Sequence, residues 1–391
     1  MKSVLFPYTH TAVGGSYISS SLLVKHLHAL SDWDVRVCLP RRGLNAPIFE
    51  FDDFRPDYLD TKIMSESGLR HKSLARRLPA HIQAYRLAIS YLRNHRPDLV
   101  HVNDTKTQLI WGWAARRLKI PVVFHVRNVG KTGMDRYCLP LANHLIIVSD
   151  AVRGRLAGYR KLPPHETIHN AVDFDTFYPP RSREEYRMRL GLNPGRLTLG
   201  FVGNLLSRKR PEWAVKAAVE LLERGSDVQL VVVGEDKSDG RAYERRLKAM
   251  VEEAGVSEHV HFLGYRDDVP DVMRALDMLL LASTEKGEGF PRVVIEAMAS
   301  GAAVVATRVA GVPEVFTDGV SGLMADPDDY SAFAQAVRTL AEDDALRRDI
   351  ACRGHEEALA RFSVATCGER VIAVYNKVLG DKVLGDKVLG G

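Results

Sequence analysis

Two glutamates within residues 283–326 carry the clearest chemical signal in the chain. Glu288 lies in a glycine-containing loop, and Glu296 lies eight residues later inside the apolar run VVIEAMA. A carboxylate among apolar neighbours is expected to be buried, and a buried carboxylate needs hydrogen-bond donors. Paired hydroxyls of a sugar are suitable donors for this acceptor-only group. A solvated glutamate on an amphipathic helix is the alternative, but the sequence around Glu296 shows no polar face.

The elements that must position these carboxylates can be predicted from the same stretch. Gly287 and Gly289 flank Glu288 in a loop that needs backbone freedom, Pro291 suits a first helical residue, and Gly301 suits a helix end. The predicted order is loop, helix, strand, loop, short helix, strand. A helix N-terminus behind glycines can bind an anion through its N–H groups and its dipole.

A cluster of cations precedes a second predicted helix. Arg208, Lys209 and Arg210 follow a predicted strand over residues 197–202 and stand directly before a helix that begins at Pro211. Three cations and a helix dipole would converge on one place, where they could stabilise a diphosphate that gains charge as its bond to a sugar breaks. Plain surface cations are the alternative, above all for Arg210.

The spacing Glu288-x7-Glu296 inside EGFPRVVIEAMASGAAVVAT resembles the donor-site signature of the retaining family-4 glycosyltransferases with the GT-B fold. The resemblance implies that Glu288 contacts the transferred sugar and that Glu296 holds the ribose hydroxyls of a nucleotide. It also implies that the backbone of the loop Gly289, Phe290 and Pro291 faces the diphosphate.

The loop GNLLSRKRPEW is part of the same resemblance. Lys209 matches the family's lysine, which neutralises the leaving diphosphate, and Gly203 and Asn204 fall in the donor-binding loop. Two positions depart from the family pattern: Asn204 stands where an arginine commonly follows the glycine, and Arg210 replaces the second glycine of a Lys-Gly pair. Arg208 is therefore predicted to take over the role of the missing arginine.

The first half of the chain supplies further candidates. Gly14 and Gly15 follow a predicted strand over residues 2–8 and precede a helix, and in the resembling family a glycine pair at this place faces the donor. His125, in FHVRN near the end of a strand predicted over residues 121–126, matches the family's active-site histidine, which contacts the transferred sugar.

Three more residues are predicted on the acceptor side. His101 and Asp104 lie at the end of a strand predicted over residues 99–103, and Arg127 follows His125. Open α/β sheets bind ligands at the carboxyl ends of their strands. A buried structural role is the alternative for a histidine in a strand.

No metal or other cofactor is expected. Two Asp-x-Asp pairs occur, at residues 32–34 and 173–175, but one precedes a predicted strand and the other lies in a connector bounded by prolines. The resembling family works without a metal, so the cations around Lys209 must neutralise the diphosphate.

The predicted fold class is α/β: a GT-B fold of two Rossmann-like domains that face each other across a cleft. Residues 1–178 would form the acceptor-side domain, residues 179–195 a linker, and residues 196–362 the nucleotide-sugar-binding domain. A terminal helix over residues 363–391 would cross back to the first domain and end in the repeat KVLGDKVLGDKVLGG.

Composition indicates a globular protein. In its 391 residues no apolar run is long enough to span a bilayer, and the N-terminal apolar segment is too short for a signal peptide. The four cysteines show no metal-ligand spacing, so reduced thiols in a cytoplasmic protein are expected.

The charge is unevenly distributed. Residues 1–180 carry a net charge of +10 and residues 181–391 one of −5, and a basic helical segment is predicted over residues 69–96 with an interruption at Pro79. A basic amphipathic helix can contact an anionic membrane, which would place the protein at the inner membrane face. A helix packed on the sheet is the alternative, and no nucleic-acid partner is expected.

The predicted activity is that of a retaining glycosyltransferase. It would move a hexose-type sugar from a nucleotide-sugar, UDP-linked first and GDP-linked next, to a hydroxyl of a glycan or lipid-linked acceptor. Synthesis of a cell-envelope polysaccharide, lipopolysaccharide or glycolipid is the expected setting. A nucleotide-sugar epimerase of the same fold and a non-catalytic sugar-nucleotide-binding subunit are the alternatives.

Overall fold

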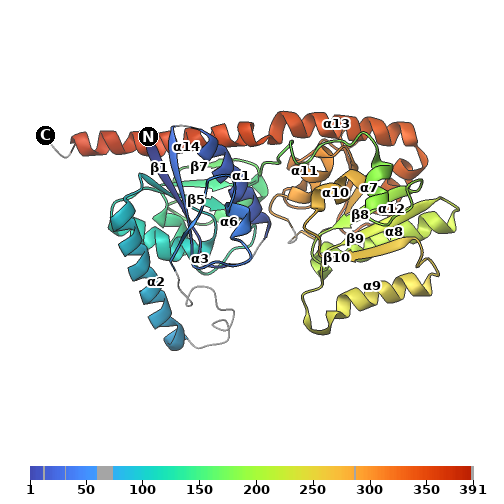
Figure 1. Ribbon diagram of the computed structural model, residues 1–391, viewed down its shortest axis with the longest axis horizontal. Helices are drawn as coiled ribbons and strands as arrows, with labels where there is room; N and C mark the ends of the chain where they lie inside the picture. The colour runs from blue at the N-terminus through green and yellow to red at the C-terminus, as the bar shows by residue number, and fades with distance from the viewer. Residues whose placement is uncertain (12–13, 31, 60–73, 286–287, 389–391) are drawn as a thin grey trace. The chain divides into compact units, whose positions relative to one another are not determined.

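The protein forms two compact units, each built on one parallel sheet (Figure 1). The computed structural model describes residues 1–11, 14–30, 32–59, 74–285 and 288–388. The first unit comprises Met1–Asn170 and Val364–Gly391, and the second comprises Ala171–Ser363. The described residues contain no helix that is both long and apolar enough to cross a membrane.

The sheet of the first unit has the strand order β3-β2-β1-β4-β5-β6-β7, and every pairing is parallel. Parallel neighbours require crossover connections, and helices supply most of them. The strands are β1 (Lys2–Pro7), β2 (Trp33–Leu39), β3 (Asp57–Tyr58), β4 (Leu99–Val102), β5 (Val122–Val126), β6 (His144–Ile147) and β7 (His165–Thr167). The helical elements between them that matter below are α1 (Gly15–Ala29), α2 (Leu74–His95), α3 (Thr105–Thr107), η3 (Gln108–Gly112), α4 (Trp113–Arg117) and α6 (Asp150–Leu156).

The basic segment predicted over residues 69–96 is largely helix α2. Residues 69–73 lie outside the described part of the chain, and the helix continues through Pro79, where an interruption was predicted. Pro79 is the sixth residue of the helix, so it removes one backbone hydrogen bond near the N-terminus and leaves most of the helix intact.

The last helix, α14 (Val364–Val388), belongs to the first unit. It packs against α1 at Gly368, where an added Cβ would lie 2.3 Å from the ring of His26. Lys377 donates a hydrogen bond to Glu166 at 3.0 Å, and Arg370 donates one to the carbonyl of Thr167 at 2.6 Å. These contacts attach the end of the chain to β7 at the edge of the first sheet.

The sheet of the second unit has the order β10-β9-β8-β11-β12-β13, again wholly parallel. Its strands are short apolar runs that are mostly buried, as expected for a parallel sheet covered by helices. The strands are β8 (Leu197–Val202), β9 (Val228–Val233), β10 (Val260–Gly264), β11 (Met278–Leu281), β12 (Ala303–Thr307) and β13 (Leu323–Ala325). The helices include α7 (Arg183–Arg189), α8 (Pro211–Glu223), α9 (Ala242–Glu253), α10 (Val269–Ala275), α11 (Arg292–Ala299), α12 (Tyr330–Glu342) and α13 (Asp344–Phe362).

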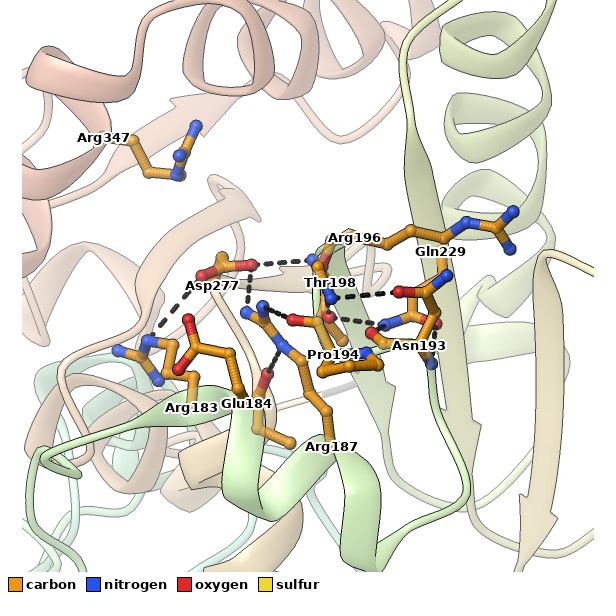
Figure 2. A network of polar contacts seen from close by, with 12 residues as sticks. Arg183, Glu184, Arg187, Asn193, Pro194, Arg196, Thr198, Gln229, Asp277 and Arg347 are labelled. Atoms are coloured by element: carbon orange, nitrogen blue, oxygen red, sulfur yellow. Dashed lines mark hydrogen bonds and ion pairs between the residues drawn. The ribbon is translucent and has the colours of Figure 1, made fainter.

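The segment predicted as a linker, residues 179–195, lies inside the second unit. Its helix α7 is held by a buried polar network (Figure 2). Arg187 donates to Asp277 at 2.6 Å and to the carbonyls of Ala275 at 3.1 Å and Pro194 at 3.0 Å, and Arg183 lies 3.7 Å from the same carboxylate. A buried arginine with this many acceptors fixes the segment to the body of the unit, which a flexible linker would not allow.

Both sheets reverse their strand order beside their first strand. In the first unit β1 lies between β2 and β4, and in the second β8 lies between β9 and β11. Open parallel sheets bind ligands at such switch points, at the carboxyl ends of the strands. The fold therefore predicts a binding site at the loops that follow β1, β4, β8 and β11.

Candidate functional site

The loops that follow β8 and β11 meet at the carboxyl edge of the second sheet. The backbone N–H of Thr284 donates a hydrogen bond to the carbonyl of Arg208 at 2.8 Å. This contact joins the predicted cation cluster, residues 208–210, to the loop that carries Glu288. The sequence distance between them is large, and only the adjacency of β8 and β11 brings them together.

Lys209 and Glu288 form an ion pair at this edge. The Lys209 ammonium donates to Oε1 of Glu288, and the Ser283 hydroxyl donates to the same oxygen at 2.8 Å. Ser283 is held in turn by Thr307, whose hydroxyl donates to the Ser283 carbonyl at 2.6 Å. Glu288 is only 8% exposed, so its charge is balanced by Lys209 and its oxygen is hydrogen-bonded by Ser283. Sequence analysis did not single out Ser283 or Thr307.

Glu296 is buried as predicted, at 9% exposure, and it has a partner that sequence analysis missed. Arg292 donates to Oε1 of Glu296 at 2.6 Å, and the two residues are four apart on helix α11. The spacing i, i+4 places both side chains on one helix face, which was the available signal. A sugar hydroxyl would therefore meet a carboxylate that already has one charged partner.

The order of elements predicted around the two glutamates is confirmed. Helix α11 is followed by β12, by the short helix η7 (Val312–Glu314) and by β13. The helix begins at Arg292, one residue later than predicted, because Pro291 has the extended conformation of an N-cap. Gly301 follows the helix with φ +69° and its N–H bonds to the carbonyl of Met298, as in a left-handed helix end.

Phe290 anchors the loop that precedes α11. Its side chain is buried and meets Phe362 edge-on, with ring centroids 5.4 Å apart. Gly289 and Pro291, the other members of the predicted diphosphate loop, adjoin this anchor. The Phe290 side chain is thus part of the core of the second unit, and only its backbone is available for the role that the resemblance implies. Gly287 lies outside the described residues.

The loop after β8 approaches the loop after β9 very closely. An added Cβ on Gly234, whose φ is +137°, would lie 1.9 Å from the carbonyl oxygen of Gly203. Glycine is therefore required at Gly234, and Gly203 takes its own position from this contact. Asn204, the next residue, is exposed at the surface of this loop.

Arg210 has a left-handed backbone, with φ +46° and ψ +50°. This conformation favours glycine, which explains why a glycine suits the position in the resembling family. The Arg210 guanidinium donates to the carbonyl of Pro327, pairs with Asp328 at 3.2 Å and lies 4.9 Å from the ring centre of Trp213. Lys209 is thus paired with the loop glutamate, whereas Arg210 is bound to the loop before α12.

In the first unit, His125 lies near the carboxyl end of β5 and is held by Arg127. An Arg127 N–H lies 3.1 Å from Nδ1 of His125, and an arginine can only donate, so Nδ1 accepts and the ring proton is on Nε2. Arg127 also donates to Asn103 at 3.0 Å and to Asn170 at 2.6 Å. Nε2 of His125 is buried without a hydrogen-bond partner among the described residues. The arrangement presents a neutral N–H donor.

His125 stays neutral over the physiological range. Burial, then the Arg127 charge and His101, hold the pKa of His125 well below its usual value of 6.5. Burial, followed by the same arginine, lowers the pKa of His101 to about 3. A charged imidazole is disfavoured because, among the described residues, no carboxylate acts on either ring to offset desolvation.

His101 and Asp104 have structural roles in the first unit. His101 is fully buried, stacks on Phe6 and shares a 2.6 Å hydrogen bond with the Tyr375 hydroxyl of α14. The Asp104 carboxylate caps helix α3 by accepting from the N–H of Thr107 at 2.9 Å. The contacts of both residues are therefore those of buried or capping groups.

Gly14 is the N-cap of α1, and Gly15 is the first residue of that helix. Gly14 has an extended backbone, φ −166°, which any residue can adopt, and an added Cβ would meet no atom within 4 Å. Neither local conformation nor packing within the protein requires glycine there. The resemblance implies a different reason for glycine at this position, which is to leave space for a ligand.

Neither Asp-x-Asp pair forms a group of potential metal ligands. The Asp173 carboxylate accepts from the N–H of Asp175 at 3.0 Å and from the hydroxyl of Thr176 at 2.6 Å, which makes it a turn-forming side chain. Among the described residues no cluster of three or more His, Cys, Asp or Glu side chains could hold a metal ion.

Comparison with known proteins gives a consistent result for both units. Residues 182–357 match the family described as glycosyl transferases group 1, and residues 13–176 match glycosyltransferase family 4. The chain is 31% identical over 314 residues to a D-inositol 3-phosphate glycosyltransferase of Mycobacterium sp. (strain KMS). This match covers 73% of this chain and 69% of that protein. It is 29% identical over 266 residues to the lipopolysaccharide core biosynthesis mannosyltransferase LpsB of Rhizobium meliloti (strain 1021), covering 67% and 74%.

Solved structures share the fold across nearly the whole chain. Anabaena Alr3699/HepE, in complex with UDP and glucose, aligns with a TM-score of 0.80 at 22% identity, over 96% of this chain and 100% of that one. A sucrose-phosphate synthase from Thermosynechococcus elongatus aligns with a TM-score of 0.80 at 22% identity, over 97% and 100%. The predicted GT-B fold of two Rossmann-like domains is confirmed. The chain belongs to the group 1 glycosyltransferases.

Proposed function

We propose that this glycosyltransferase is a retaining, metal-independent hexosyltransferase that uses a UDP- or GDP-linked sugar. The acceptor is a hydroxyl of a glycan or lipid-linked saccharide of the cell envelope, in lipopolysaccharide, polysaccharide or glycolipid synthesis. The observation that carries the proposal is the buried pair of Lys209 and Glu288 beside helix α11. It places a cation and a carboxylate at the carboxyl edge of the second sheet, where a sugar diphosphate would need both.

The reaction breaks the bond between the anomeric carbon of the sugar and the diphosphate oxygen. Negative charge develops on the leaving diphosphate, and in this proposal Lys209, with Arg208 and the N-terminus of α11, stabilises it. The acceptor oxygen forms the new bond on the same face of the sugar, and its proton passes to the leaving phosphate. This route retains the anomeric configuration and requires no metal ion.

The carboxylates and the histidine have separate tasks in this reaction. Glu288 accepts hydrogen bonds from the sugar. When Lys209 turns toward a phosphate, Glu288 still accepts a hydrogen bond from the Ser283 hydroxyl. Glu296 accepts from the ribose hydroxyls, while Arg292 forms an ion pair with the same carboxylate. His125 donates from Nε2 to a sugar hydroxyl and takes no part in proton transfer, because its pKa is held well below 6.5.

The relatives support the substrate class without naming one substrate. LpsB is a mannosyltransferase of the lipopolysaccharide core, the mycobacterial relative glycosylates inositol 3-phosphate, and the Anabaena neighbour binds UDP and glucose. A mannosyl group and glucose, both hexoses, occur in two of these names, and they support a hexose-type sugar for this chain. UDP and GDP are therefore the first donor bases to examine.

The test is a thermal-unfolding screen with UDP-, GDP-, ADP-, CDP- and dTDP-sugars, followed by transfer assays. A donor at a hundred times its Kd should stabilise the protein by about 2.7 kcal/mol. Glu296→Ala and Lys209→Ala should lose this shift, whereas Lys216→Ala, an exposed lysine on α8, should keep it.

The product decides the mechanism. With the donor identified, transfer to envelope glycans should give a product with the donor's anomeric configuration by NMR, and EDTA should not reduce the rate. An inverted product would refute the retaining mechanism. A new sugar isomer formed without acceptor would indicate an epimerase, and binding with neither transfer nor hydrolysis would indicate a non-catalytic subunit.

A further inference from the structure

Helices α2 and α4 of the first unit pack side by side and leave an apolar groove between them. The groove has a volume of about 260 Å³ and is lined by His81 and Tyr85 of α2, by Leu109 and Ile110 of η3, and by Trp113 of α4. Two large apolar side chains of these helices are exposed, Ile82 of α2 at 44% and Trp113 of α4 at 46%. An exposed apolar cluster on an otherwise ordinary surface marks an interaction site.

The helical segments that form this groove carry cations and no carboxylates of their own. The sequence of α2, and that of residues 105–119 across α3, η3 and α4, contains no Asp or Glu. The exposed cations on and beside these elements are Arg86, Arg93, Lys106, Arg116, Arg117 and Lys119. We call the groove, its two exposed apolar residues and these cations the α2–α4 surface.

The cations and the apolar residues share helix faces. Arg86 is four residues after Ile82 on α2, and Arg116 and Arg117 are three and four residues after Trp113. Long basic side chains can extend from such faces toward phosphate groups while their stems cover apolar surface. A tryptophan with one apolar and one polar edge suits the level of lipid headgroups.

We propose that the α2–α4 surface docks on an anionic lipid bilayer, with Trp113 and Ile82 inserted at headgroup depth. Apolar residues that could insert, a border of cations and the lack of carboxylates together match an anionic membrane interface. The membrane contact predicted for residues 69–96 is thereby assigned to described residues of α2 and of the segment from α3 to Lys119, which lies outside residues 69–96. The proposal does not depend on which sugar is transferred.

Flotation of the purified full-length protein with vesicles tests this proposal. Vesicles with phosphatidylglycerol should bind the protein, vesicles of pure phosphatidylcholine should bind it much less, and added salt should weaken the binding. Arg86→Gln with Arg117→Gln should lower the partition coefficient about fivefold for each cation removed. The matched control is Arg245→Gln with Arg246→Gln, two exposed cations of α9 in the second unit.

The apolar part is tested separately. Ile82→Ser with Trp113→Ser should reduce binding by about tenfold or more, whereas Met188→Ser with Leu359→Ser, at two exposed apolar positions of the second unit, should not. Brominated lipids should quench part of the tryptophan fluorescence of the wild-type protein, which has four tryptophans, and Trp113→Phe should lose that quenched part. Absent binding to anionic vesicles, equal binding to neutral ones, or unchanged binding of both α2–α4 variants would overturn the proposal.

Discussion

The two units place opposite kinds of polar groups at the carboxyl edges of similar sheets. In the second unit the candidate groups are ion pairs, Lys209 with Glu288 and Arg292 with Glu296. In the first unit the central group is a neutral histidine, His125, whose Nδ1 accepts from Arg127, and Arg127 in turn donates to the amide side chains of Asn103 and Asn170. The same Rossmann-like frame therefore presents ion-paired carboxylates at Glu288 and Glu296 and a neutral N–H donor at His125.

The difference follows from what each half is proposed to bind. A leaving diphosphate gains negative charge, so a cation that is kept in place by a carboxylate until the ligand arrives is useful. A sugar hydroxyl has no charge, and a neutral N–H donor binds it without adding a charge that burial would penalise. Arg127 serves to fix the imidazole of His125, since it donates to Nδ1 of that ring and to the neutral amides of Asn103 and Asn170.

Removal of the Lys209 charge should have the largest effect. Lys209→Met is expected to lower kcat by about 100- to 1,000-fold, because the diphosphate loses its cation in the transition state. Steady-state transfer assays with saturating donor measure this loss. The matched control is Lys216→Met, at an exposed lysine on α8, the helix that follows Lys209. Unimpaired turnover of Lys209→Met would contradict the assigned role.

The second prediction concerns stability and pH in the first unit. His101 and His125 have folded pKa values below the unfolded value of 6.5, so below pH 6.5 the unfolded chain binds protons that the folded chain does not. Stability should therefore fall as pH decreases from about 7 to 5, by about 2 kcal/mol for each histidine at pH 5. Urea unfolding at several pH values measures the slope.

Substitution distinguishes the histidines from other titrating groups. His101→Gln should flatten the stability curve between pH 7 and 5, because the glutamine does not titrate. Replacement of the exposed His95 by Gln is the control and should leave the curve as steep as in the wild-type protein. An equal slope in wild type and His101→Gln would show that the buried imidazole is protonated in the folded state, contrary to its surroundings.

The third prediction concerns the tautomer of His125. Arg127→Met should raise the pKa of His125, since burial would then act without the neighbouring guanidinium, and should release the constraint that keeps the proton on Nε2. The expected loss in kcat/KM is about tenfold, for one oriented hydrogen bond. The ¹⁵N chemical shifts of the His125 ring report the tautomer directly. Arg127→Lys, which can still donate, should preserve it.

Local signals account for what the sequence predicted correctly. The glycine after α11, the proline before it and the apolar strand that follows are short-range features, and they placed each element around Glu288 and Glu296. The burial of Glu296 followed from its apolar neighbours. The pair of Arg292 and Glu296 was missed, although its i, i+4 spacing is a sequence signal for an ion pair on one helix face.

Contacts between distant residues account for what the sequence could not predict. Residues 179–195 have the proline and charge content of a linker, but Arg187 is buried against Asp277, ninety positions away. Arg127 reaches Asn170 across forty-three positions, and Lys209 reaches Glu288 across seventy-nine. Such partners become neighbours only when β8 and β11, or β5 and β7, take their places in the sheets.

The smallest expected effect is at Arg210 of the second unit. Its backbone has an unfavourable left-handed conformation, while its side chain makes stabilising contacts. Arg210→Gly removes a left-handed conformation that costs a non-glycine residue about 1 kcal/mol, but it also removes the guanidinium contacts with Pro327, Asp328 and Trp213. These contributions are of similar size, so the free energy of unfolding should change by less than about 1 kcal/mol. Donor affinity should be unchanged if Arg210 is a structural cation. A loss of donor binding comparable to that of Lys209→Ala would instead place Arg210 among the groups that hold the diphosphate.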